Sequence, residues 1–223
     1  MNVTIPCKAA TLEGELVIPA GARGIVLFAH GSGSSRHSPR NQFVARTIRD
    51  SGNGTLLFDL LTTNEEMEDN QTTRFRFDIP LLASRLSEAT LWLLLQPAVR
   101  HLGVGYFGSS TGAGAALIAA ARKPHLIDAV VSRGGRPDMA GQALECVKAP
   151  TLLIVGGDDD TVMELNKEAL ARLRCKKALS VVPGATHLFE EPGALEAVAR
   201  LAADWFAGHL NVHPSRPEVE TRP

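Results

Sequence analysis

Short runs of apolar and β-branched residues alternate along the chain with segments whose apolar residues recur every three or four positions. The first pattern is typical of β-strands and the second of helices. Their alternation predicts an α/β fold, in which helices cover both faces of a mostly parallel sheet. The apolar runs predict eight strands, at residues 3–8, 11–18, 24–29, 55–60, 102–107, 127–132, 151–155 and 178–182.

The predicted strands are of two kinds. Residues 3–8 and 11–18 alternate only in part and lie close together in the sequence, so we expect an antiparallel hairpin at the edge of the sheet. Residues 24–29 are almost continuously apolar, as expected of a strand that is buried on both faces.

Six segments have the helical pattern: 39–50, 78–96, 111–122, 138–147, 162–173 and 192–209. We expect a single domain over residues 1–210, because neither an internal repeat nor a domain boundary is visible. Residues 211–223 are polar and carry three prolines, which predicts a flexible C-terminal tail. Residues 62–76 are acidic without a clear period, and we interpret them as a solvated loop that could instead contact a partner or edge a pocket.

Composition and charge narrow the class of protein. The 223 residues are 44% hydrophobic and 21% charged, within the usual range for a soluble globular protein. The net charge of -1 provides no broad positive field, so we do not expect nucleic-acid binding. We also expect no secretion signal and no membrane anchor, because the longest apolar run, 91–95, is far too short to cross a bilayer.

The three cysteines, Cys7, Cys146 and Cys175, are odd in number and widely separated. Their spacing has no C-x-x-C pair that would indicate a zinc or redox site, so we expect a reduced, cytoplasmic setting.

One motif carries candidate chemistry. Gly108, Ser110 and Gly112 satisfy G-x-S-x-G between a predicted strand and an alanine-rich predicted helix. A nucleophile in that position sits on a sharp turn where strand and helix backbones nearly touch, which requires residues without side chains on either side. We therefore expect Ser110 to be a nucleophile; the alternative is a flexible loop with a helix cap.

An acid and a histidine follow in the order that such a serine requires. The predicted strand 151–155 leads into three consecutive carboxylates, of which we choose Asp159, while Asp158 and Asp160 remain alternatives. Asp160 lies where we expect a helix N-cap. His187 follows the last predicted strand, so the order serine, aspartate, histidine, each after a strand, predicts a catalytic triad.

The same chemistry needs two N–H donors for the negative oxygen of a tetrahedral intermediate. We expect them to be the amides of Thr111, directly after the serine, and of Ser32, in the glycine-rich segment after the strand at 24–29. His30 should orient that segment through hydrogen bonds. Four arginines could face the mouth of the pocket and bind a carboxylate or phosphate, or could be ordinary surface residues and loop anchors. They are Arg36, Arg40, Arg133 and Arg136.

These motifs resemble those of the α/β-hydrolase superfamily, and within it the small, lidless bacterial proteins related to dienelactone hydrolase. The resemblance covers nearly the whole chain and implies an acyl-enzyme mechanism on Ser110, Asp159 and His187 without a metal or cofactor. Dienelactone hydrolase itself has a cysteine nucleophile, so Ser110 indicates a serine esterase instead. Only residues 134–149 separate two predicted strands where lipases carry a lid, which predicts small, soluble ester substrates.

Other functions remain open on this scaffold: a thioesterase, a peptidase or acyltransferase with the same triad, or a binding protein without activity. Residues 103–108 also match G-x-G-x-x-G, but these glycines lie within a predicted strand and not after it, which disfavours a dinucleotide site. We expect a small-molecule ester as the partner and a monomer or homodimer as the assembly.

Overall fold

A computed structural model describes residues 1–213 of the chain. Within these residues, eight strands form one sheet in the order β1-β2-β4-β3-β5-β6-β7-β8. β1 and β2 pair antiparallel at the edge, β2 runs antiparallel to β4, and the other neighbours are parallel. The strands are β1 (Asn2–Cys7), β2 (Ala10–Val17), β3 (Gly24–Ala29), β4 (Gly54–Phe58), β5 (Gly103–Ser109), β6 (Ala129–Arg133), β7 (Thr151–Gly156) and β8 (Lys177–Val182). The predicted α/β sheet and its edge hairpin are confirmed.

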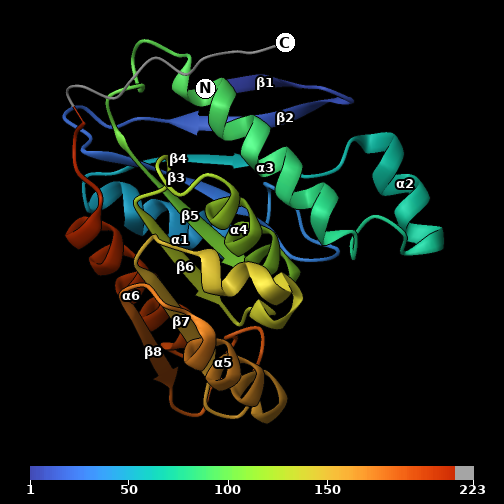
Figure 1. Cartoon of the computed structure of the whole chain (residues 1–223), viewed down its shortest axis with the longest axis vertical. Helices are drawn as coiled ribbons and strands as arrows, with labels where there is room; N and C mark the ends of the chain where they lie inside the picture. The colour runs from blue at the N-terminus through green and yellow to red at the C-terminus, as the bar shows by residue number, and fades with distance from the viewer. Residues whose placement is uncertain (214–223) are drawn as a thin grey trace.

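Helices cover both faces of the sheet (Figure 1). They are α1 (Pro39–Asp50), α2 (Thr63–Thr72), α3 (Ile79–Leu94), α4 (Thr111–Arg122), the 3₁₀ segment η1 (Pro137–Cys146), α5 (Asp160–Arg172) and α6 (Ala194–His209). One apolar core includes side chains of α3, α4 and α5, and a second includes side chains of α1 and α6. Because both faces are covered, every residue of β3 to β7 is buried, which explains their almost continuous apolar sequences.

The parallel strands place their following loops at one edge of the sheet. The loops after β3, β5, β6, β7 and β8 all begin there, and all of the residues expected to do chemistry lie in them or next to them. In open α/β sheets this edge is where ligands bind.

The interpretation of residues 62–76 as a loop was wrong, because they contain α2. A capping box begins this helix: the Thr62 side chain accepts from the Glu65 amide, and the Glu65 carboxylate accepts from the Thr62 amide. Asp69 is the one buried residue of the helix. α2 is held by ion pairs of Glu65 with Arg85 and of Asp69 with Arg76, so it has no apolar stripe that a periodic pattern would reveal.

Two further expectations need correction or restriction. The predicted helix 138–147 is the 3₁₀ segment η1, interrupted at Gly141 with φ 54°. Of the predicted tail, residues 214–223 lie outside the described residues, while the His213 amide donates to the His101 carbonyl at 2.7 Å. Within residues 1–213 the structure contains no helix with the length and apolarity that a bilayer span requires.

Replacing Glu65 with alanine should lower the free energy of unfolding by about 2 kcal/mol, because Arg85 would become a buried charge without its carboxylate. The Arg85 side chain is only 5% exposed. Glu68→Ala on the same helix is the control, since its ion pair with Arg74 is exposed and its removal should change stability by less than about 0.5 kcal/mol. Urea denaturation followed by circular dichroism measures both values, and equal losses would contradict the anchoring role of Glu65.

Candidate active site

Ser110 occupies a sharp turn between β5 and α4. Its backbone has φ 50° and ψ -124°, a conformation that residues with side chains rarely adopt. A Cβ at Gly112 would overlap the carbonyl oxygen of Ala29, and one at Gly108 would lie 2.5 Å from Cα of Ala113. The turn therefore depends on the absence of side chains at positions 108 and 112, as the sequence predicted.

Hydrogen bonds of the main chain fix this turn. The Ser110 amide donates to the Arg133 carbonyl at 3.3 Å, and the Arg136 amide donates to the Ser110 carbonyl at 2.9 Å. The Ser110 hydroxyl, in contrast, makes no hydrogen bond to any other residue in the described part of the chain. The backbone of the serine is held while its side chain is left available.

Asp159 and His187 form a hydrogen-bonded pair. The Nδ1 atom of His187 donates to Oδ2 of Asp159 at 2.7 Å, which leaves Nε2 as the ring nitrogen that can accept a proton. The other carboxylate oxygen, Oδ1, accepts from the Val162 amide at 3.4 Å and caps α5. The expectation that Asp160 is the N-cap was wrong. Asp159 is the cap of α5, and its other carboxylate oxygen bonds to His187.

Ser110 and His187 line the same opening, which we call the Ser110 cleft. It has a volume of about 180 Å³ and is also lined by residues of the loop after β3, by Arg40 and Arg133, and by Gly134 and Leu188. The hydroxyl of Ser110 and the imidazole of His187 share this cleft without a hydrogen bond between them. Of the three predicted triad residues, the structure pairs two and places the third beside the same cleft.

The predicted N–H donors lie side by side, but one of them is occupied. The Ser32 amide donates to Oγ1 of Thr111 at 3.1 Å, and the two hydroxyl groups are also 3.1 Å apart. The Thr111 hydroxyl thus occupies the place where the negative oxygen of a bound substrate would accept from the Ser32 amide. Sequence reasoning missed this contact, since nothing in the spacing of two residues so far apart indicates that they touch.

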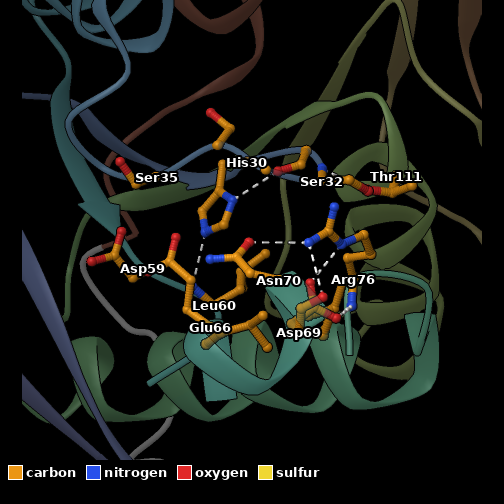
Figure 2. Close-up of a pocket in the computed structure, with 15 residues that line it drawn as sticks. His30, Ser32, Ser35, Asp59, Leu60, Glu66, Asp69, Asn70, Arg76 and Thr111 are labelled. Atoms are coloured by element: carbon orange, nitrogen blue, oxygen red, sulfur yellow. Dashed lines mark hydrogen bonds and ion pairs between the residues drawn. The ribbon is translucent and has the colours of Figure 1, made fainter. Parts of the chain in front are cut away.

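His30 holds the loop that contains Ser32. Its Nδ1 atom donates to the Gly31 carbonyl at 3.0 Å, and its Nε2 atom accepts from the Leu60 amide at 3.0 Å, as Figure 2 shows. The expected orienting role of His30 is confirmed by these two bonds. Desolvation of the ring lowers its pKa, so the neutral form that can accept from Leu60 is favoured.

A second cavity lies on the other side of this loop, between it and α2 (Figure 2). Its volume is about 30 Å³, which leaves room for little more than a water molecule. Arg76 at its wall is bonded to Asp69 and Asn70. Between the two openings, only the Ser110 cleft has space for a substrate.

The four candidate arginines fall into two groups. Arg36 is bonded to Asp59 and to Glu13 and lies outside the Ser110 cleft, so it acts as a loop anchor. Arg136 is bonded through two nitrogens to its neighbour Asp138. Arg40 and Arg133 line the cleft. Within residues 1–213, no group of three or more His, Cys, Asp or Glu side chains is arranged to hold a metal ion.

Comparisons with known proteins agree on the fold. The model of the dienelactone hydrolase family matches residues 12–211. The crystal structure of a dienelactone hydrolase from Anabaena variabilis is 59% identical, with a TM-score of 0.93 over 95% of this chain and 98% of that one. Est1E from Butyrivibrio proteoclasticus is 15% identical, with a TM-score of 0.77 over 93% of this chain and 98% of its own, and this likeness shows the fold alone.

Two curated relatives come from strains CDC 1551 and H37Rv of Mycobacterium tuberculosis. Both are 61% identical over 209 residues, which is 94% of this chain and 46% of each relative. Their name proposes a phosphoribosyl transferase activity. The chain spans about half the length of these relatives.

The pKa of His30 predicts how stability depends on pH. Because that pKa is lowered in the folded state from its ordinary value of 6.5, the folded protein binds fewer protons there than the unfolded chain. The free energy of unfolding should therefore be highest above pH 6.5 and fall below it, with a slope of up to about 1.4 kcal/mol per pH unit from this group.

Urea denaturation between pH 8 and 5 measures the slope, and His30→Gln, whose amide oxygen can still accept from Leu60, should reduce it. His37→Gln, at an exposed histidine of the same loop, is the control. An identical slope in the parent and His30→Gln proteins would contradict the assignment to His30.

Proposed function

The chain belongs to the dienelactone hydrolase family, and on that premise we propose that it is a serine hydrolase that cleaves small carboxylic esters through an acyl-enzyme on Ser110. The observation that carries the proposal is the 2.7 Å hydrogen bond between His187 and Asp159 at a cleft that Ser110 also lines. The family alone supports a hydrolase; the nucleophile, the triad and the ester substrate are our assignment.

In the proposed reaction, the Ser110 hydroxyl attacks the ester carbonyl carbon while Nε2 of His187 takes the hydroxyl proton. Asp159 holds the imidazole in the tautomer that can accept this proton and stabilises the resulting cation. The imidazolium then protonates the departing alkoxide, and an alcohol leaves. A water molecule repeats the sequence on the acyl-enzyme, which releases the acid and restores the serine. His187 must first turn toward Ser110, since the two side chains are not hydrogen-bonded in the structure.

The amides of Thr111 and Ser32 stabilise the negative oxygen that forms during both attacks. Because the Ser32 amide donates to the Thr111 hydroxyl, the substrate oxygen has to replace that hydroxyl as the acceptor. Rotation of the Thr111 side chain about one bond is enough to free the amide. The Thr111 hydroxyl thereby gives the Ser32 amide an acceptor between turnovers without blocking it permanently.

The size of the cleft favours small substrates. Its volume of about 180 Å³ is below the roughly 300 Å³ at which sites for drug-sized ligands begin. The segment between β6 and β7 contains only the short η1, so no lid folds over Ser110 from there in the described structure. A panel of esters, thioesters and amides with short acyl groups would separate the esterase from the thioesterase and peptidase alternatives.

The nucleophile is tested by Ser110→Ala, which should lower kcat for p-nitrophenyl acetate by about four to six orders of magnitude without unfolding the protein. Ser109→Ala is the matched control, because it removes a neighbouring hydroxyl of the same motif and should retain parent rates within about threefold. If Ser110→Ala retained near-parent rates, the assigned nucleophile would be wrong.

The choice among the three aspartates is tested by Asp159→Asn. This variant should lower kcat by about three to four orders of magnitude, because an amide no longer holds the imidazole in the tautomer needed to accept the serine proton. Asp158→Asn and Asp160→Asn, which keep the bond to His187, should remain within about threefold of the parent. A loss in either control as large as that in Asp159→Asn would move the assignment to the neighbouring carboxylate.

A further inference from the structure

Arg133 is a buried cation that has no anionic partner among residues 1–213. The residue is 8% exposed, and among the described residues its Nε and Nη1 atoms are enclosed with no hydrogen-bond acceptor. The centre of its guanidinium lies 6.0 Å from the centroid of the Phe189 ring, an arrangement that compensates a buried charge only weakly. A buried charge that lacks a partner destabilises a fold, so its presence calls for another explanation.

The place of Arg133 in the sheet puts its side chain beside the Ser110 cleft. As the last residue of β6 it pairs in register with Ser109 on β5, so it lies directly beside the turn that carries Ser110. Arg133 lines the cleft, and since Nε and Nη1 are enclosed, Nη2 is the nitrogen that faces the opening. The turn after β6 is made by Gly134, with φ 48°, which adds no side chain between the guanidinium and the cleft.

A second arginine faces the same space. Arg40, on α1, also lines the cleft, and its Nε atom has no hydrogen-bond partner among residues 1–213. Its Nη1 atom is 3.0 Å from Glu190, but the Glu190 side chain is 63% exposed, so this pair is weak and open to exchange. Burial and then the nearby Arg40 charge lower the pKa of Arg133 to about 10, so Arg133 is still cationic at neutral pH.

The residues that line the cleft thus include two arginines and no carboxylate. We propose that Arg133 and Arg40 form a subsite for a phosphate group carried by the substrate, so that the preferred substrates are small esters bearing a phosphomonoester. A phosphate dianion matches both guanidinium charges, whereas a carboxylate matches one. Ser32 and Ser34 line the same cleft, and their hydroxyls are donors suited to the remaining phosphate oxygens. The phosphate subsite itself is argued from the two arginines. It rests on the proposed function only in that the ester bond has to reach Ser110.

Binding of inorganic phosphate tests the subsite without any catalytic step. Calorimetric titration at neutral pH and constant ionic strength should show saturable, one-to-one binding to the parent and to Ser110→Ala. Arg133→Met should weaken it roughly tenfold or more, and Arg40→Gln should also weaken it. Arg136→Met, at an arginine already bonded to Asp138, should bind phosphate like the parent.

Arg133→Met should also have a higher thermal unfolding midpoint than the parent, because it removes an unpaired buried charge and keeps a side chain of similar length. This second readout shows that a loss of phosphate binding is not a loss of folding. The subsite is overturned if the parent does not bind phosphate, if Arg133→Met binds it as tightly, or if acetate binds as tightly as phosphate.

Substrate preference supplies the catalytic arm of the test. The parent should hydrolyse an acetyl ester of glycerol 3-phosphate with a kcat/KM about tenfold or more above that of the matching glycerol ester, and Arg133→Met should lose this preference. If neither ester is hydrolysed while phosphate still binds, the proposed function fails and the subsite stands. If both esters are hydrolysed equally well by the parent, the subsite fails and the proposed function stands.

Discussion

The rest of the site depends on the close contact of three backbone segments at the Ser110 turn. They are the end of β3, the end of β5 and the start of α4. The first turn of α4 approaches the end of β3 so closely that position 112 has no room for a Cβ beside the Ala29 carbonyl. This contact forces the chain to reverse within one residue, and Ser110 takes the positive φ, at a cost of about 1–3 kcal/mol. The turn lifts the hydroxyl out of the sheet, and the same contact brings the Ser32 and Thr111 segments together.

Two polar side chains near this turn, Asp159 and His30, each bond to two neighbours. One oxygen of Asp159 caps α5 while the other accepts from His187, so the helix fixes the carboxylate that fixes the imidazole. His30 connects the loop after β3 to the end of β4 through a donor and an acceptor on one ring. Such fully bonded groups hold the loops in place. Arg133 differs from these groups, because its Nε and Nη1 atoms are enclosed and have no acceptor among the described residues, and this points to a ligand.

The sequence predicted the sheet because its central strands are buried on both faces and are therefore apolar almost throughout. It also predicted the positions of Ser110, Asp159 and His187, because each follows a strand and has glycine nearby. It could not predict that α2 is a helix from apolar periodicity, since α2 is held by Glu65 and Asp69 through ion pairs; the spacing of Thr62 and Glu65 was the available signal. Neither the contact of Ser32 with Thr111 nor the isolation of Arg133 has a local signature, because both depend on segments far apart in the chain.

The central claim is that Ser110 is activated as a nucleophile, and covalent labelling measures this directly. Incubation with a fluorophosphonate, followed by intact-mass and peptide mass spectrometry, should show one adduct per chain on Ser110. Labelling should slow by orders of magnitude in a His187→Gln protein, because the imidazole no longer removes the hydroxyl proton. An unlabelled parent protein, or an adduct on a different residue, would contradict the account.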